Sequence, residues 1–168
     1  MVRDDRRTKV GAICGEIDFE RPWNVEIVFA AGLHDDLADI QNLLPLLAGN
    51  DIRSMSSATQ TVLTNTDVIA VDQDPLGAQG KVVATPAANL QVWSKPLSGT
   101  NARAVALLNR TSGSASITVQ WTTLGLPAGS ATVRDLWNHT DLGTIANTYT
   151  ATAIPSHGVV MLKVVSSP

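Results

Sequence analysis

Short apolar runs with a period of two fill the second half of the chain, from Lys81 onward. The runs are KVVAT, NLQVWSKPL, ARAVALLNR, ASITVQW, ATVRDLW and HGVVMLKVV, and turn clusters such as SGTN at 98–101 and PAG at 127–129 separate them. Strands at this spacing, without a helical period between them, are typical of antiparallel sandwiches and barrels. We therefore expect residues 81–168 to form an antiparallel β-sandwich of about eight strands, a mainly β fold.

Two residues are expected to protect strand ends and edges from pairing with other chains. Pro96 lies near the end of one run and has no N–H to give to a neighbouring strand. Lys163 interrupts the last apolar run, and a charge discourages pairing at an edge.

The stretch between residues 50 and 80 has the character of a connection between two structures. SATQ at 57–60 fits a capping box, in which Ser57 begins a helix, and Asn65 is predicted to end that helix in the left-handed conformation. TDVIAV at 66–71 predicts a second short helical turn, and DPLG at 74–77 breaks it.

The N-terminal part has no single period. Residues 1–22 mix arginines with acids, and no apolar pattern indicates an element. After them come a strand-like run at 25–30 and a helix-like stretch at 33–44 with apolar residues three and four apart. Pro45 ends or kinks this stretch, because its ring clashes with the preceding turn.

Charge and composition exclude several classes of partner and cofactor. A formal net charge of −3 gives no basic footprint for nucleic acid or an anionic membrane. No apolar run reaches the ~20 residues of a membrane span, and no signal peptide is recognised, which leaves the localisation open. The single Cys14 cannot form an internal disulfide, and His34, His139 and His157 lack metal-ligand spacing, so we expect neither metal nor cofactor.

A long series of segments resembles the α-galactosidases (melibiases), which are of the glycoside hydrolase family 27 type. The end of their catalytic domain is matched by PLLAGNDIRSM at 45–55, VLTN at 62–65 and VIAVDQDPLGAQG at 68–80. Their C-terminal sandwich is matched by QVWSKPLSG at 91–99, AVALLNR at 104–110, DLW at 135–137 and IPSHGV at 154–159. The resemblance covers about residues 43–168. The parent enzymes of this family are often secreted.

The resemblance implies a (β/α)₈ barrel followed by a β-sandwich. It also implies retaining hydrolysis of terminal α-linked galactose by two carboxylates. In that frame residues 46–49 match the eighth barrel strand and the helix at Ser57 the last barrel helix. Residues 43–80 are then a mostly helical barrel-end remnant and linker, and residues 81–168 are the sandwich. Residues 1–42 stay unassigned, either disordered or rearranged.

The family's catalytic motifs have no match in this chain. The resemblance implies a nucleophile in a Lys-Tyr-Asp-x-Cys motif, but GAI precedes Cys14 and holds no carboxylate. GEI at 15–17 is similar to the Gly-Asp-Ile motif of the acid/base, with Glu16 for Asp, but it lies much closer to Asn50 than the family spacing allows. The WN pair at 23–24 lacks the acids that follow it in the family. We therefore assign no catalytic residue and expect an accessory domain that is inactive alone.

For the other acids that could form a catalytic pair, and for the tryptophans that could bind a sugar, we favour structural roles. Asp51 can cap a turn or pair with Arg53, and Asp72 and Asp74 lie where aspartate bonds its own backbone. The aromatic candidates for stacking on a sugar are Trp93, Trp121 and Trp137, and an inward Trp on a strand is usually core.

Two partner hypotheses and one motif remain. The first partner is the parent's catalytic barrel, or a second copy of the chain, meeting an apolar seam. That seam comprises Leu46, Leu47, Val62, Leu63 and Ile69. The alternative is a free-standing module that binds carbohydrate through tryptophan. The motif is Asn-x-Thr, at NRT 109–111 and NHT 138–140, which fits N-glycosylation in a secretory eukaryotic host.

Overall fold

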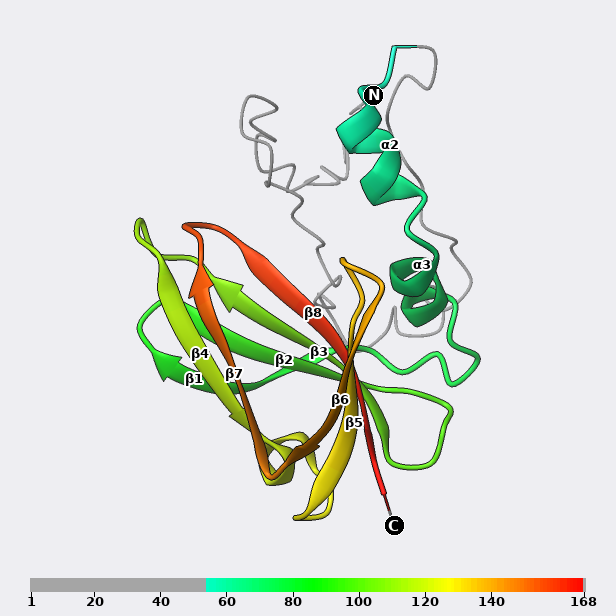
Figure 1. The fold of residues 1–168 in the computed structure, drawn as a ribbon, viewed down its shortest axis with the longest axis vertical. Coiled ribbons are helices and arrows are strands. Elements are labelled where there is room, and N and C mark those ends of the chain that lie inside the picture. Colours follow the sequence, from blue (N-terminus) through cyan, green and yellow to red (C-terminus); the bar gives the residue numbers. More distant parts are fainter. Residues whose placement is uncertain (1–53, 168) are drawn as a thin grey trace, which may run out of the picture.

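The structure is a computed structural model that describes residues 54–167, in which a β-sandwich carries two short helices on one side (Figure 1). Predictions that fall on residues 1–53 lie outside the described residues. They include the strand-like run at 25–30, the helix-like stretch at 33–44 and the barrel strand at 46–49.

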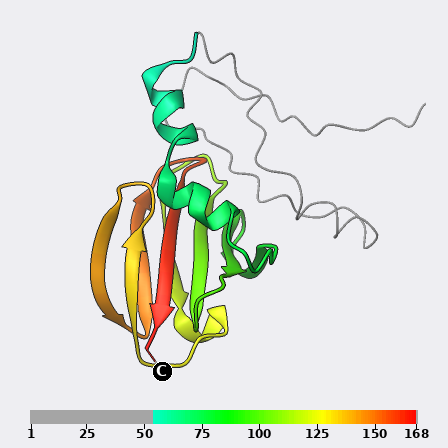
Figure 2. The ribbon, with the colours of Figure 1, turned by 90° about the vertical axis from the view of Figure 1, so that its right-hand side faces the viewer.

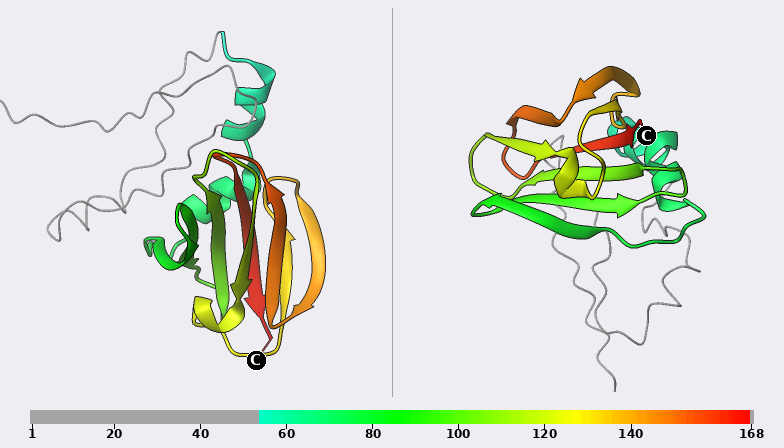
Figure 3. Two further views of the ribbon diagram at one scale, coloured as in Figure 1. Left: turned by 90° about the vertical axis from the view of Figure 1, so that its left-hand side faces the viewer. Right: turned by 90° about the horizontal axis from the view of Figure 1, so that it is seen from below.

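Eight strands build the sandwich. They are β1 (Lys81–Ala87), β2 (Leu90–Pro96), β3 (Ala102–Asn109), β4 (Ala115–Gln120), β5 (Ser130–Asp135), β6 (Thr140–Ala146), β7 (Thr148–Ile154) and β8 (Val159–Ser166). One sheet has six strands in the order β1-β2-β3-β8-β5-β6, and the other pairs β4 with β7. Neighbouring strands run antiparallel, and Figure 3 shows the two layers from below. The predicted fold class is confirmed.

Two of the strands, β6 and β7, are not among the six runs that the sequence pattern identified. Six of the seven residues of β6 are exposed and the other is half-buried, so its side chains need no apolar alternation. In β7, with the sequence TYTATAI, only Ala151 and Ile154 are buried. Strand pairing alone requires no apolar pattern, and these two strands have little of it. The run in β1 is the exception, since its valines are exposed.

The main core lies between the two sheets, and β2, β3, β4, β5 and β8 each contribute two buried residues at alternate positions. On β3, for example, Val105 and Leu107 point into it with no exposed surface. Trp121 is the largest fully buried side chain, and it begins a 3₁₀ turn, η1 (Trp121–Leu124), that closes one end of the sandwich. Its indole Nε1 donates to the carbonyl oxygen of Ile145 at 3.1 Å, so the one polar atom of the ring is satisfied.

The prediction for Pro96 is confirmed, and the prediction for Lys163 is wrong. Pro96 is the last residue of β2, and β1 pairs only as far as Ser94, so no bond is lost there. Lys163 lies on β8, which is a central strand between β3 and β5. Its exposed side chain is on the face of the sheet turned away from β4 and β7. The charge interrupts the apolar run because that face is open at this point.

The helices are α2 (Ser57–Leu63) and α3 (Thr66–Asp72), and both predicted helical segments are confirmed. The predicted caps were wrong. Ser56, one residue earlier than predicted, accepts from the backbone N–H of Thr59 at 3.1 Å and caps α2. Asn65 has a φ of −66° and caps the start of α3 rather than ending α2 in the left-handed conformation.

A truncated chain that begins near Asn50 is expected to unfold in one cooperative transition, because the strands form their own core. Chemical denaturation followed by tryptophan fluorescence measures this. Loss of the cooperative transition would mean that the N-terminal segment removed by the truncation is integral to the fold.

Candidate functional site

Helix α3 packs on the outer face of the six-stranded sheet, the face turned away from β4 and β7, whereas α2 projects beyond the sandwich (Figures 1 and 2). Val71 is the buried residue of α3, with 4% of its surface exposed, and it belongs to a second apolar cluster separate from the main core. The other buried members are Leu97, Ala102, Ala104, Leu136 and Met161. In α2, by contrast, no residue is buried. The connection is therefore fixed to the sandwich from α3 onward.

Asn65 joins the start of α3 to the turn that follows β5. Its Oδ1 accepts from the backbone N–H of Val68 at 3.1 Å, which caps the helix. Its Nδ2 donates to the carbonyl oxygen of Leu136 at 2.9 Å. The residue is buried, so both ends of the amide are satisfied in a place where an unpaired group would be costly.

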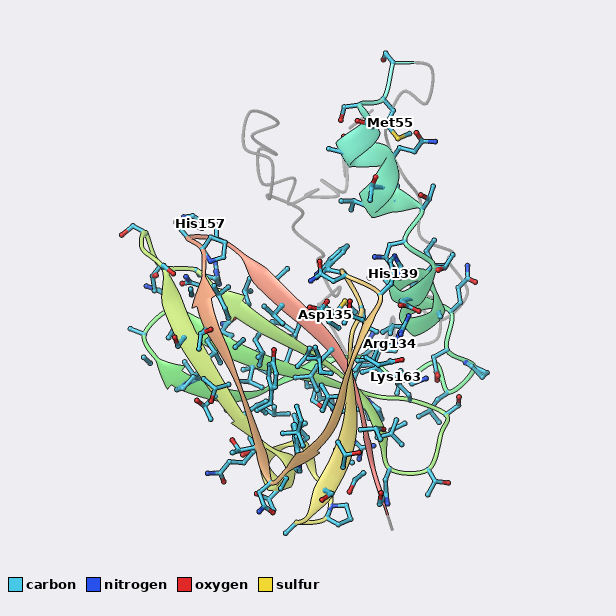
Figure 4. The ribbon with its side chains drawn as sticks, viewed as in Figure 1. Met55, Arg134, Asp135, His139, His157 and Lys163 are labelled. Atoms are coloured by element: carbon cyan, nitrogen blue, oxygen red, sulfur yellow. The ribbon has the colours of Figure 1, made fainter. Side chains whose placement is uncertain are left out.

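Asp67, in the first turn of α3, makes the second polar contact to the sandwich. Its Oδ2 accepts from Arg134 Nε at 3.0 Å and forms an ion pair with Nη2 of the same residue, also at 3.0 Å. Oδ2 also lies 2.9 Å from Nδ1 of His139. Arg134 also donates from Nη1 to Asp141 Oδ1 at 2.8 Å. Figure 4 shows Arg134 and His139 beside α3, and His157 well away from them.

The pKa of Asp67 lies below its ordinary value. Burial alone raises this pKa, but the hydrogen bonds and charges of His139 and Arg134 favour the carboxylate and outweigh burial. Asp67 is therefore ionised at neutral pH and held by donors.

Asp74 makes the third polar contact, from the segment that follows α3 to the turn after β2. Its carboxylate accepts from Ser98 N at 2.9 and 3.1 Å and from Ser98 Oγ at 3.0 Å. Oδ1 also accepts from Leu76 N at 3.0 Å, which confirms the predicted turn. Burial raises the pKa of Asp74, but these donors and the charge of Lys95 lower it further than burial raises it. We call Asn65, Asp67, Val71 and Asp74 the linker clamp.

The carboxylates of the clamp do not have the property that a general acid needs. A general acid in glycoside hydrolysis needs a carboxyl group whose pKa is raised, so that it still carries a proton near neutral pH. Asp67 and Asp74 are shifted in the other direction. Their oxygens are also occupied by donors that tie the helical segment to the sandwich.

The other sequence candidates are scattered. Asp72 is exposed at the end of α3, and His157 is exposed in the turn before β8. Within residues 54–167, no group of three His, Cys, Asp or Glu side chains could hold a metal ion. Cys14, Glu16, His34 and Asp51 lie outside the described residues, so the expectation of no catalytic residue and no cofactor stays a prediction.

The three tryptophans proposed as candidates for sugar stacking divide into two kinds. Trp121 is a core residue, as predicted, with no exposed surface. Trp93 is half-buried, and its Nε1 donates to Gln91 Oε1 at 3.1 Å. Trp137 is half-buried and packs on the second apolar cluster, as does Val68 of α3. Thus Trp121 presents no face to a sugar, and Trp137 contributes to the docking of the helix.

Replacing Asp67 with asparagine is expected to lower the free energy of unfolding at pH 7 by on the order of 1 kcal/mol, because charge-assisted bonds to Arg134 are lost. The folded pKa of Asp67 is lowered, so its contribution is present above the unfolded pKa of about 3.9 and is lost as the pH falls through the folded value. The difference between the wild type and Asp67→Asn should therefore shrink below about pH 4. Denaturant titrations at several pH values measure it.

Asp141→Asn is the matched control, since Asp141 binds the same arginine but its side chain is 77% exposed, against 25% for Asp67. A smaller loss is expected for it. Equal losses would show that the Asp67–Arg134 contact stabilises the domain no more than the exposed Asp141–Arg134 pair does.

No helix among the described residues is long and apolar enough to cross a membrane.

Comparison with known proteins gives one family model, the "Alpha galactosidase C-terminal beta sandwich domain", over residues 87–164. The chain is 53% identical over 96 residues to an α-galactosidase of Coffea arabica, across 56% of this chain and 25% of that protein. It is 43% identical over 118 residues to an α-galactosidase of Cyamopsis tetragonoloba, across 70% of this chain and 28% of that protein.

Among solved structures, α-galactosidase I from Mortierella vinacea aligns with a TM-score of 0.67 and 32% identity. The alignment covers 73% of this chain and 32% of that one. The chain thus spans about a quarter to a third of the relatives that it matches.

Proposed function

Because residues 87–164 are a C-terminal β-sandwich domain of the α-galactosidase family, we propose that this chain supports a catalytic barrel and does not hydrolyse glycosides itself. The reaction to which it would contribute is the hydrolysis of terminal α-linked galactose with retention, by two carboxylates that belong to the barrel. Fold alone does not assign an activity, so the proposal depends on the site.

The observation that carries the proposal is the linker clamp. Val71, Asn65 and Asp67 fix α3 to the outer face of the sheet, and Asp74 fixes the segment after it. These contacts hold α3 and the segment after it against the sandwich. A domain that must hold a neighbouring barrel in place needs such a fixed connection. A freely tethered binding module would not need it.

The surface expected to meet the barrel is the apolar seam. Val62 and Leu63 of α2 and Ile69 of α3 are half-buried, and Leu46 and Leu47 lie outside the described residues. Apolar patches beyond a few hundred Å² on a soluble monomer usually find a partner. We propose the barrel as that partner, and self-association through the same seam when the barrel is absent.

The sugar-binding alternative has less support. The outer face has a depression of about 320 Å³ lined by Thr132, Val133, Arg134, Asp141, Gly143, Thr144, Lys163 and Val165. None of the three candidate tryptophans lines it, so it offers no aromatic platform for a sugar ring.

The purified full chain is expected to show no turnover of an aryl α-galactoside, because the family's nucleophile motif has no counterpart in the sequence. A relative with its barrel intact, such as the coffee enzyme, serves as the positive control. Turnover by the chain that disappears in a Glu16→Gln variant would overturn the proposal.

A further inference from the structure

The chain carries two Asn-x-Thr motifs, and the fold places them in opposite surroundings. Asn109 is the last residue of β3, and Asn138 lies in the turn between β5 and β6. N-glycosylation joins a sugar to Nδ2 of the asparagine. The hydrogen bonds that each Nδ2 makes in the folded chain therefore indicate whether a sugar can be attached there.

The Nδ2 of Asn109 is fully engaged inside the protein. It donates to the carbonyl oxygens of Gly113 at 2.8 Å, Ile154 at 2.9 Å and Pro155 at 2.9 Å. The residue has no exposed surface. A sugar would replace one of the two amide hydrogens and would need space that is absent, so at least one buried carbonyl would lose its donor.

The hydroxyl of the same motif is also occupied. Thr111 Oγ1 donates to Asn109 Oδ1 at 2.7 Å or to Gly113 O at 2.9 Å, and Asn109 Oδ1 also accepts from Thr111 N at 2.9 Å. The NRT motif is thus a structural unit that ties the end of β3 to two loops.

Asn138 has the opposite character. It is exposed, and its Nδ2 donates to Asp135 Oδ2 at 2.8 Å. An N-linked asparagine keeps one N–H, so this bond can persist beside a glycan. Thr140 is exposed as well, and its Oγ1 donates to the carbonyl oxygen of Asn138 at 3.0 Å.

We propose that Asn138 is an N-glycosylation site and that Asn109 is not, in chains that fold in a compartment where N-glycans are attached. The co-substrate is a lipid-pyrophosphate-linked oligosaccharide. The bond from Nδ2 to the sugar's C1 forms, the bond from C1 to the pyrophosphate oxygen breaks, and the amide proton leaves to a base of the transferase. A chain modified at Asn109 could not close the bonds of that site and would be lost from the folded pool.

The test is secretion of the full chain, behind a cleavable signal peptide, from a eukaryotic cell. Intact mass is measured before and after enzymatic release of N-glycans in ¹⁸O-water, which marks the modified asparagine. The expected result is one glycan per folded chain, at Asn138. Thr140→Ala should remove it without altering Asn138, and Thr140→Ser, the matched control, should retain it.

Translation with microsomes provides a second measurement if secretion is poor. There the protease-resistant fraction should be modified at Asn138 and unmodified at Asn109. An unmodified Asn138 in folded wild-type chains, a glycan on Asn109 in those chains, or a glycan that persists in Thr140→Ala would each overturn the proposal. Since activity is not the readout, these results do not depend on the proposed function.

Discussion

Replacing Asn109 with aspartate is expected to destabilise the domain by about 3–5 kcal/mol near neutral pH, the cost of leaving a buried charge without a partner. The substitution keeps the shape of the side chain but removes the donor that serves Gly113, Ile154 and Pro155. A carboxylate oxygen would then face carbonyl oxygens in a site with no exposed surface. Folded domains are stable by only about 5–15 kcal/mol, so much of the stability should disappear.

Asn147→Asp is the matched control for this substitution. Asn147 is exposed and uses its side chain only as an acceptor, from Gly129 N at 2.9 Å, which a carboxylate also provides. Its effect should stay within about 0.5 kcal/mol. Urea titration of both variants and the wild type measures the difference. Similar stabilities for the two aspartate variants would mean that the Asn109 network contributes little.

Five of the six strands that the sequence predicted bury at least two residues. The exception is β1, which was predicted from its valines although six of its seven residues are exposed. In β2, β3 and β8, buried residues recur at alternate or successive positions, and the apolar runs mark them directly. The mostly exposed β6 and the weakly buried β7 carry little of this signal. β6 pairs with β5, and β7 pairs with β4. No local pattern in the sequence encodes which strands pair.

The linker clamp could not be predicted from local patterns, because its partners are far apart in the chain. Asn65 bonds to Leu136, 71 residues away, and Asp67 bonds to Arg134, 67 residues away. In the sequence alone, Asn65 fits a helix stop as well as a helix cap. Its φ of −66° and the bond that it accepts from Val68 N identify it as the cap of α3. Asp74 was predictable as a turn residue, but its bonds to Ser98 were not.

A chimeric enzyme can show whether this sandwich supports a catalytic barrel. In the coffee α-galactosidase, the segment that matches this chain is replaced by the corresponding residues of this chain, with the linker clamp included. If the sandwich supports the barrel, the chimera should keep kcat/KM within about tenfold of the parent, a difference of about 1.4 kcal/mol. The same enzyme truncated before the segment should lose soluble, active protein.

A chimera that carries Asn65→Ala together with Asp67→Asn serves as the matched variant. It should retain its catalytic residues, because none is altered, but it should inactivate at a lower temperature than the intact chimera. The clamp no longer holds α3 through its polar contacts in that variant.

Hydrolysis of an aryl α-galactoside by the intact chimera, set beside the truncated enzyme, is the most direct measurement of whether this chain supports a barrel. The expected result is robust turnover by the chimera and little or none by the truncated enzyme. A chimera whose sandwich is folded, as shown by resistance to proteolysis, but which is no more active than the truncated enzyme would contradict the proposed role.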